Sequence, residues 1–284
     1  MLAKRFPTIL PPLSLNEALE TTKIHSVVGL LPSDCSLIYE RPFRNPHHTI
    51  SDVALVGGGN YPRPGEISLA HNGVLFLDEL PEFKRSVLEV LRQPMESRKM
   101  TISRSKFTVD YPASFMLVAS MNPCPCGYYT HPEKDCVCSP TAVQNYLNKI
   151  SGPLLDRIDL HIEVKPVDYD DLADERPQES SEAILKRVLA ARDLQTKRYE
   201  KEADTHCNAQ MTSGHIREYC VLSKASQILL KRAMQHYQLS ARAYDRILKV
   251  ARTIADLGGK EKVLPEHVAE AIQFRSLDKE NWVQ

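Results

Sequence analysis

The sequence predicts two parts, an α/β core followed by a domain made only of helices. Two apolar runs, Val74–Leu77 and residues 115–119, have the length and the near-continuous hydrophobicity of parallel strands buried on both faces. A third run at residues 160–164 is also predicted as a strand. After about residue 180, apolar residues recur only at helical spacing. The change of pattern therefore marks a domain boundary.

Helix signals support this division. Between the first two strands, Pro81 fits the first position of a helix that Pro94 would end or kink. In the last part at least four helices are expected, with serine N-caps at Ser181, Ser223 and Ser240. The predicted domains are the core at residues 1–168, an acidic linker at 169–180 and the helical domain at 181–284.

Composition limits the classes of function. The 284 residues include 36 basic and 36 acidic side chains, so contact with nucleic acid must use a local patch. No apolar run approaches the roughly 20 residues of a membrane span, and early prolines interrupt any signal-peptide core. We therefore expect a cytoplasmic protein without a membrane partner. Four of the seven cysteines lie within residues 124–138, which suits a metal site better than a disulfide framework.

The stretch "GVLFLDEL" (residues 73–80) places two carboxylates at the end of a buried strand. In this position Asp78 would hold the water shell of a Mg²⁺ ion bound to nucleotide phosphates. Glu79 would polarise an attacking water, as in a Walker B motif. A strand that ends in two solvated acids fits this short pattern equally well.

Two polar residues further along the chain favour a nucleotide site. Asn122 follows the next predicted strand, at the edge where open α/β sheets bind ligands, and would orient the lytic water or sense the γ-phosphate. Arg157 lies between an apolar helix end and a predicted strand. From there it would reach the phosphates of a neighbouring subunit as an arginine finger. A local ion pair with Asp156 or Asp159 is the alternative.

Several segments, in order, resemble the AAA+ ATPases of the magnesium-chelatase-like family, of the YifB/ComM type. They are "RPFRNPHHTIS", "NGVLFLDELPEF", "ASMNPCPCGY", "SGPLLDRIDLHIEV" and "ARAYDRILKVARTIADL", and the resemblance covers nearly the whole chain. It implies a P-loop NTPase core with a parallel sheet, an all-α lid domain, and ATP and Mg²⁺ as cofactors. It also implies Arg242 as sensor 2, the arginine that touches the γ-phosphate, with Arg246 as second choice. Solvated or locally paired arginines are the alternative.

The glycine-rich phosphate loop that works with a Walker B motif is missing from these residues. No glycine begins the pattern G-x-x-x-x-G-K-[ST]. In related proteins this loop directly precedes a segment like "MLAKRFPTILPPL", with which the chain starts, and an N-terminal Lon-protease-like domain comes earlier still. We therefore expect the C-terminal portion of a longer protein, with a core incomplete at its N-terminus. Alone, it is expected not to hydrolyse ATP, because the groups that cradle the phosphates are missing.

The cysteine-rich loop at residues 123–139 has the spacing C-x-C, nine residues, C-x-C. Two close thiol pairs can supply four thiolates to a tetrahedral Zn²⁺ ion with a structural role. The usual spacing is C-x-x-C, so free or redox-labile thiols are the alternative. The candidate ligands are Cys124, Cys126, Cys136 and Cys138, and His131 could replace one of them.

Residues 98–110 are predicted as a hairpin of two alternating strands around the polar tip "RS". Related AAA+ motors carry a hairpin at this place that projects into the pore of the ring. Basic side chains would let it grip nucleic-acid phosphates, although a solvated surface hairpin fits equally well. These side chains are Arg98, Lys99, Arg104 and Lys106.

The Pro-rich segment "RPFRNPHHTIS" contains two adjacent histidines, His47 and His48. Adjacent side chains point apart in an extended chain, so this is a poor metal pair. We expect loop structure or a second substrate contact there rather than a catalytic role.

Three functions are compatible with these features. The first, favoured by the resemblance, is a ring-forming, hexameric, ATP-driven motor on single-stranded or branched DNA, acting as a helicase or branch-migration factor in DNA uptake or recombination. The second is an ATPase subunit of a metal chelatase, which would need partner subunits. The third is a non-catalytic, zinc-containing interaction module, which would explain the missing phosphate loop.

Overall fold

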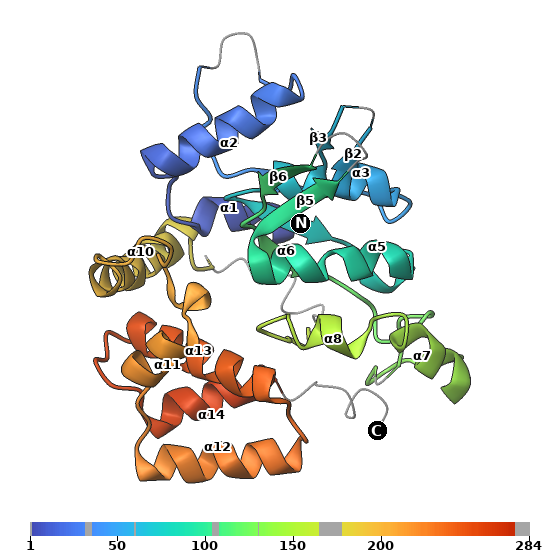
Figure 1. Cartoon of the computed structure of the whole chain (residues 1–284). Helices are drawn as coiled ribbons and strands as arrows, with labels where there is room; N and C mark the ends of the chain where they lie inside the picture. The colour runs from blue at the N-terminus through green and yellow to red at the C-terminus, as the bar shows by residue number, and fades with distance from the viewer. Residues whose placement is uncertain are drawn as a thin grey trace. The chain divides into compact units, whose positions relative to one another are not determined.

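The computed structural model describes residues 2–31, 36–59, 61–103, 108–129, 131–164 and 178–275. The chain divides into two compact units, Met1–Arg157 and Ile158–Gln284 (Figure 1). Each unit has its own cluster of buried apolar side chains. Most of the predicted linker at 169–180 lies outside the described residues. Among the helices of the described ranges, none is both long and apolar enough to cross a membrane.

The first unit is built around a parallel sheet with the strand order β1 (Phe43–Arg44), β4 (Val74–Leu77) and β7 (Met116–Ala119). Three of the four side chains of the central strand β4 are buried, as predicted. The strand predicted at residues 115–119 is confirmed as β7, but its predicted burial on both faces is wrong, because Met116 is 40% exposed. Within the described part of the chain, β7 pairs only with β4 and is therefore an edge strand.

The strand predicted at residues 160–164 is not found. These residues form irregular chain, in which the backbone N–H of His161 donates to the carbonyl oxygen of Phe274 at 2.8 Å. Ile162 and Val164 are 66% and 82% exposed. Their alternation resembles that of a strand, but the side chains do not pack against a sheet face.

The region predicted as one helix from Pro81 is divided into three short pieces. Pro81 lies in a 3₁₀ helix. Pro94 does not end the pattern but interrupts it, because α5 ends at Val90, whose carbonyl oxygen would need an N–H from residue 94. The apolar residues that predicted this helix, including Phe83 and Leu91, are buried in the core of the first unit. The three pieces are η2 (Leu80–Glu82), α5 (Arg85–Val90) and α6 (Arg92–Ser97).

The remaining helices of the first unit are short, apart from α2. Its start is fixed by a capping box, in which Ser14 Oγ accepts from the N–H of Glu17 at 3.3 Å and Glu17 Oε2 accepts from the N–H of Ser14 at 2.8 Å. These helices are η1 (Leu2–Arg5), α1 (Phe6–Ile9), α2 (Leu15–Val27), α3 (Asp52–Val56), α4 (Glu66–Leu69), α7 (Pro140–Leu147) and α8 (Gly152–Leu155).

Two antiparallel hairpins complete the first unit. The predicted hairpin is confirmed as β5 (Lys99–Ser103) paired with β6 (Thr108–Pro112), and a second one pairs β2 (Gly57–Gly58) with β3 (Arg63–Pro64). The hairpins are joined by a hydrogen bond of 2.8 Å from Tyr111 Oη to the carbonyl oxygen of Pro62. Gly57 has a φ of 105°, and a Cβ atom there would lie 2.2 Å from the carbonyl oxygen of Arg63, so this close approach requires glycine.

The second unit is helical, as predicted. The N-caps Ser223 and Ser240 are confirmed, because each side chain accepts a hydrogen bond from the backbone N–H three residues later. The first helix is capped by Ser180, one residue before the predicted Ser181. The elements are α10 (Ser181–Arg198), η3 (Asn208–Gln210), α11 (Ser213–Tyr219), α12 (Lys224–His236), α13 (Ala241–Leu257) and α14 (Pro265–Gln273).

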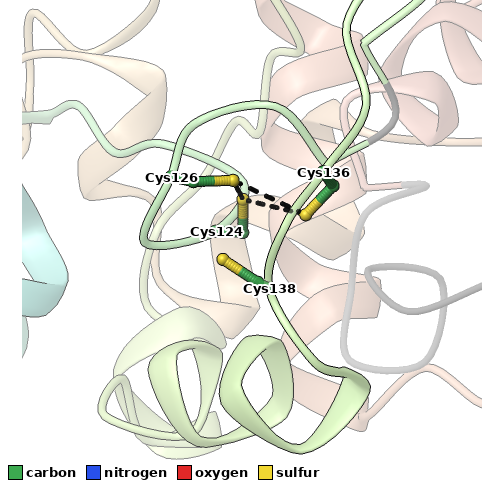
Figure 2. A group of neighbouring side chains, drawn as sticks. All are labelled: Cys124, Cys126, Cys136 and Cys138. Carbon is green, nitrogen blue, oxygen red and sulfur yellow. Dashed lines mark hydrogen bonds between the residues drawn. The ribbon is translucent and has the colours of Figure 1, made fainter.

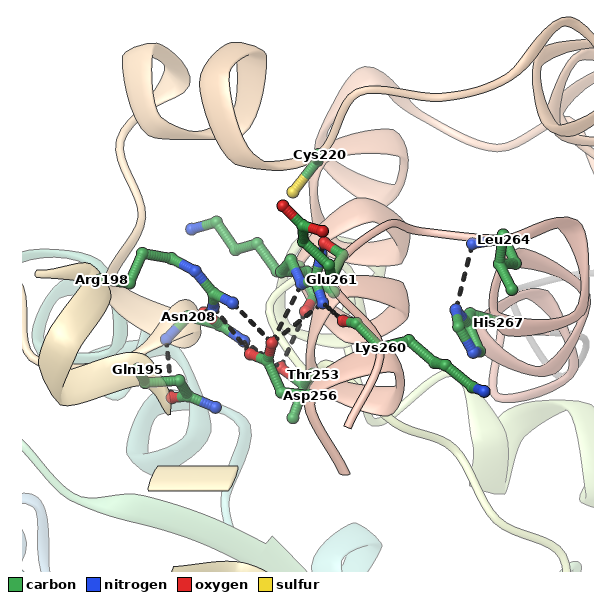
Figure 3. Close-up of polar contacts among 12 residues, drawn as sticks. Gln195, Arg198, Asn208, Cys220, Thr253, Asp256, Lys260, Glu261, Leu264 and His267 are labelled. Carbon is green, nitrogen blue, oxygen red and sulfur yellow. Dashed lines mark hydrogen bonds and ion pairs between the residues drawn. The ribbon is translucent and has the colours of Figure 1, made fainter. Parts of the chain in front are cut away.

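A buried carboxylate holds the helices of this unit together (Figure 3). Asp256 on α13 receives two hydrogen bonds from Arg198 on α10, at 2.6 and 2.7 Å, and one of 2.7 Å from Asn208 on η3. Arg252, one turn earlier on α13, also donates to it at 3.1 Å. Burial raises the pKa of Asp256, but these donors outweigh burial and lower the pKa below its usual value.

We expect Asp256→Ala to lower the free energy of unfolding at pH 7 by about 3–5 kcal/mol, because it leaves the buried Arg252 and the largely buried Arg198 without their counter-ion. Urea denaturation followed by circular dichroism measures this difference. As a control, Asp193→Ala on the exposed side of α10 should change the free energy by no more than about 0.5 kcal/mol. Equal losses in the two variants would contradict the prediction.

The same substitution should depend on pH. Since folding lowers the pKa of Asp256, its stabilising effect is present above the unfolded pKa and is lost as pH falls through the folded pKa. The difference between wild type and Asp256→Ala should therefore shrink below about pH 4.

Candidate functional site

The two acids of the "GVLFLDEL" stretch lie at the carboxyl end of β4, where the parallel register brings them beside the end of β7. Leu77 pairs with Ala119, so Asp78 and Glu79 follow one strand where Ser120 and Asn122 follow the other. Backbone hydrogen bonds tie these ends together, from Ser120 N–H to the Leu77 carbonyl and from Leu80 N–H to the Ser120 carbonyl. The structure therefore gathers polar groups at one edge of the sheet, as predicted.

Asp78 is oriented by two donors. The hydroxyl of Ser120 donates to Asp78 Oδ1, and the backbone N–H of Glu79 donates to the same oxygen at 3.1 Å. Ser120 was not predicted as a site residue. Its position in the sequence could have indicated it, because Ser120 lies one residue after the end of β7. Parallel pairing sets the residue at this position against the end of β4.

Glu79 adopts the left-handed backbone conformation, with φ 54° and ψ 51°. This conformation is uncommon for a residue other than glycine, asparagine or aspartate, and such residues cluster at functional sites. Its Oε2 atom lies 3.3 Å from Nδ1 of His48, in the loop after β1. Asp78 and Glu79 therefore have different partners, Ser120 and His48.

Asn122 is exposed just beyond β7, where its amide is available to a ligand. The cysteine-rich loop returns to this point, since a Cβ atom built on Gly127 would lie 3.9 Å from Asn122 Cγ. Tyr146 on α7 is buried nearby, and burial raises the pKa of its hydroxyl, although a hydrogen bond donated by the backbone of Asn122 offsets part of this rise. Asn122 is thus flanked by α7 and by the cysteine-rich loop.

Arg157, predicted as an arginine finger, is buried. Its guanidinium contacts Glu96 on α6 at 2.6 Å and donates to the carbonyl oxygen of Pro153, also at 2.6 Å. An ion pair was the alternative reading of this arginine, but its partner is Glu96 and not Asp156 or Asp159. Among the described residues no acceptor contacts its buried Nε.

The two candidate arginines of α13 differ in their surroundings. Arg246 forms an ion pair with Asp159, whereas Arg242, one turn earlier, is an exposed residue. Sequence spacing did not distinguish them.

The basic residues predicted for the hairpin are placed only in part. Arg98 ends α6 in the left-handed conformation and Lys99 begins β5, so both belong to the base of the hairpin and not to its tip. Arg104 and Lys106 lie outside the described residues.

The four predicted cysteines converge on one point between the end of β7 and the start of α7 (Figure 2). Their sulfur atoms all lie within 4.8 Å of one another, and three of the pairs are 3.4, 3.6 and 3.7 Å apart. Thiolates around a tetrahedral Zn²⁺ ion lie about 3.8 Å apart, because each Zn–S bond is about 2.3 Å long. The donor set therefore fits a zinc ion: Cys124, Cys126, Cys136 and Cys138.

The surroundings of the cluster shift the pKa values of Cys126 and Cys136 in opposite directions. A hydrogen bond from the backbone N–H of Tyr128 lowers the pKa of Cys126 to about 6. The backbone N–H of Cys138 lowers the pKa of Cys136, but desolvation and the neighbouring thiols of Cys126 and Cys124 outweigh it and raise this pKa to about 12. His131, the predicted substitute ligand, instead accepts from the N–H of Glu133 at 3.1 Å and is not one of the four converging groups.

Comparison with known proteins places both units in one family. The family model described as magnesium chelatase, subunit ChlI, matches residues 1–172, and the model of the ChlI C-terminal region matches residues 178–275.

Relatives cover almost all of the chain. The protein named YifB from Escherichia coli is 46% identical over 281 residues, which make up 98% of this chain and 54% of YifB. The competence protein ComM from Haemophilus influenzae is 45% identical over 280 residues, or 98% of this chain and 53% of ComM. The chloroplastic magnesium-chelatase subunit ChlI-1 of Arabidopsis thaliana is 23% identical over 222 residues, or 78% of this chain and 46% of ChlI-1.

The chain spans about half the length of these curated relatives. The resemblance seen in the sequence is confirmed over both units, which carry the parallel sheet with its terminal acids and the helical domain. The chain belongs to the magnesium chelatase ChlI family of AAA+ ATPases.

Proposed function

We propose that the chain is the C-terminal part of an AAA+ motor that uses ATP hydrolysis to remodel single-stranded or branched DNA. The observation that carries the proposal is the pair of acids at the end of β4, beside Asn122 after the neighbouring strand. Two acids and an amide at this edge suit a nucleotide with its Mg²⁺ ion. The name of one relative, competence protein, favours DNA as the substrate.

In this proposal each residue has a distinct role. Asp78, oriented by Ser120, holds the Mg²⁺ water shell, Glu79 acts on the attacking water, and Asn122 senses the γ-phosphate. Arg157 leaves Glu96 and contacts the nucleotide of a neighbouring subunit. Action on a neighbour requires a ring of subunits, for which we propose a hexamer. From the family resemblance, Arg242 is proposed as sensor 2, and Arg246, which is paired with Asp159, is the second choice.

The hairpin β5–β6 is proposed to contact DNA. In the chain it follows β4 after η2, α5 and α6, and it directly precedes β7, whose end leads to Asn122. The residues proposed to contact phosphates are Arg104 and Lys106, which lie in the sequence between the two strands, and Arg98 and Lys99 at the base of the hairpin.

The cysteine cluster is proposed to hold a structural Zn²⁺ ion. Four thiolates fill the coordination sphere of zinc and leave no open position for a reacting group, so the ion would brace the loop beside Asn122. The cluster also supports an alternative function, a non-catalytic interaction module that uses the loop and the helical unit.

ATP hydrolysis should require the phosphate loop that these 284 residues lack. We expect the chain alone to show no turnover, and a form extended at its N-terminus to include a phosphate loop to hydrolyse ATP faster when single-stranded or branched DNA is added. In the extended form, Glu79→Gln should lower kcat at least about 100-fold, because the group that acts on the water is lost. Phosphate release measures the rate.

Glu82→Gln, one turn beyond the site in η2, is the matched control and should keep most of the activity. Turnover by the short chain that Glu79→Gln abolishes would contradict the requirement for a phosphate loop. No turnover in either form would favour the interaction module.

DNA binding should depend on the hairpin tip. We expect Arg104→Ala with Lys106→Ala to weaken binding of single-stranded DNA and to reduce the slope of log K against log salt by up to about 1.4, about 0.7 for each phosphate contact. Fluorescence anisotropy at several salt concentrations measures both quantities. The control is Lys231→Ala with Arg232→Ala, which removes two exposed charges from α12. An unchanged slope in the hairpin variant would assign DNA contact elsewhere.

The chain as purified under reducing conditions should contain about one Zn²⁺ ion. Cys126→Ser or Cys138→Ser should lower the bound zinc to background, because each removes one of four thiolates. Cys207→Ser, outside the cluster, is the control and should retain it. Elemental analysis measures the stoichiometry, and a metal-free wild-type chain that keeps its fold would mean that the thiols are not a zinc site.

A further inference from the structure

We propose that the cysteine cluster is also a site of reversible oxidation, at which a peroxide joins Cys126 to Cys136 by a disulfide bond and releases the metal ion from the loop beside Asn122. The metal ion and the effect on ATP turnover rest on the proposed function, whereas the disulfide needs only residues of the loop. The basis of the inference is the position of the two sulfur atoms, which lie 3.6 Å apart and come from the two arms of the loop (Figure 2).

Chain geometry favours a bond between the arms over a bond within one arm. Cys124 and Cys126 lie 3.4 Å apart on the first arm, but a single residue separates them in the sequence. A disulfide between them would close a small ring that contains two planar peptide units, and such a ring departs from relaxed disulfide geometry. Nine residues separate Cys126 from Cys136 on the second arm, so this pair closes a wide loop free of that constraint.

Burial decides between the two closest pairs that join the arms. Cys124 lies 3.7 Å from Cys136, but Cys124 is fully buried and its sulfur accepts a hydrogen bond from the N–H of Tyr129 at 3.3 Å. Cys126 and Cys136 are partly exposed, and exposure is what lets a small oxidant act on a cysteine. The accessible pair that spans the loop is therefore Cys126 with Cys136.

The reaction needs a two-electron oxidant, which a peroxide such as H₂O₂ supplies. One of the two thiolates attacks a peroxide oxygen, so that the O–O bond breaks, a sulfenic acid forms and hydroxide leaves. The second thiolate attacks the sulfenic sulfur, so that the S–S bond forms as the S–O bond breaks and a second hydroxide leaves. The two thiolates have then lost two electrons, and the peroxide has been reduced to two hydroxide ions, which take protons from the solvent.

The disulfide removes two of the four ligands of the metal site. A sulfur atom in a disulfide is no longer a thiolate, and the thiolate is the form of cysteine that binds a metal. Only Cys124 and Cys138 then remain, which is too few for a closed tetrahedral zinc site. Oxidation of the accessible pair therefore releases the ion.

The two remaining cysteines lie at the two ends of the loop. Cys124 follows Asn122 by two residues, and Cys138 directly precedes Ser139, whose Oγ accepts from the N–H of Ala142 at 3.2 Å as the N-cap of α7. A bound ion thus ties the segment of Asn122 to the start of α7. Release of the ion cuts this tie and leaves Asn122 less restrained, so ATP turnover should fall.

The first experiment treats the zinc-loaded chain with H₂O₂ and follows free zinc with a chromogenic chelator. We expect release of about one zinc ion per chain, and dithiothreitol with added zinc should restore binding. Cys207→Ser is the matched control, because it removes a cysteine outside the cluster and should release zinc as the wild type does. Zinc that stays bound, or a chain that holds no zinc, would overturn the inference.

Peptide mapping identifies the bond that forms. Trypsin cleaves after Lys134, so a bond between the arms joins two peptides, residues 107–134 and 135–149, whereas a bond within one arm does not. Fragmentation of the joined peptides should place the bond between Cys126 and Cys136. Zinc release that yields sulfinic acids or a bond between Cys124 and Cys126 instead would overturn the inference.

A further experiment measures ATP turnover of the N-terminally extended form with single-stranded DNA, before and after the same treatment. Most of the turnover should be lost in step with zinc release, and dithiothreitol with zinc should restore it. Unchanged turnover in protein that carries the bond and has lost its zinc would overturn the regulation and leave the proposed function intact. Absence of any turnover that depends on Glu79 would instead overturn the proposed function, while the peptide map still decides whether the cysteines are oxidised as inferred.

Discussion

The parallel pairing of β4 with both of its neighbours is the constraint on which the rest of the first unit depends. Gly73, directly before β4, makes this pairing possible. A Cβ atom at this position would lie 2.1 Å from the carbonyl oxygen of Pro42, so only glycine lets β4 approach the segment before β1. From that point the register places the ends of the strands side by side. The acids after β4, the amide after β7 and the histidine after β1 share one edge for this reason.

Much of this arrangement follows from local sequence patterns, whereas the contacts between segments do not. The apolar run of β4, the hairpin β5–β6 and the caps of α12 and α13 are local signals, and all are found in the structure. The prediction of a strand at residues 160–164 is wrong. Apolar residues alternate in this segment, but alternation alone does not mean that a sheet is present for them to pack against. The pairing of His48 with Glu79 depends on the register of β1, a strand too short to be predicted.

Two of the arginines that could bind phosphate already form ion pairs with carboxylates. Arg157 contacts Glu96 and Arg246 contacts Asp159. A guanidinium binds a phosphate and a carboxylate with the same forked geometry, so a nucleotide would compete with these acids for the same donors. Phosphate binding by either arginine is therefore an exchange of partners, and its net free energy is smaller than that of the new contact alone.

The backbone edge of β7 that faces away from β4 affects how the isolated chain associates with itself. Within the part that the structure describes, this strand pairs only with β4, so its other edge presents a row of backbone N–H and C=O groups. Such an edge is a template for another strand, and Met116 adds apolar surface beside it. At high concentration, two copies can meet edge to edge and continue the sheet across the molecules. Such pairing would lower the solubility of the chain, and its net charge of zero would offer no long-range repulsion against it.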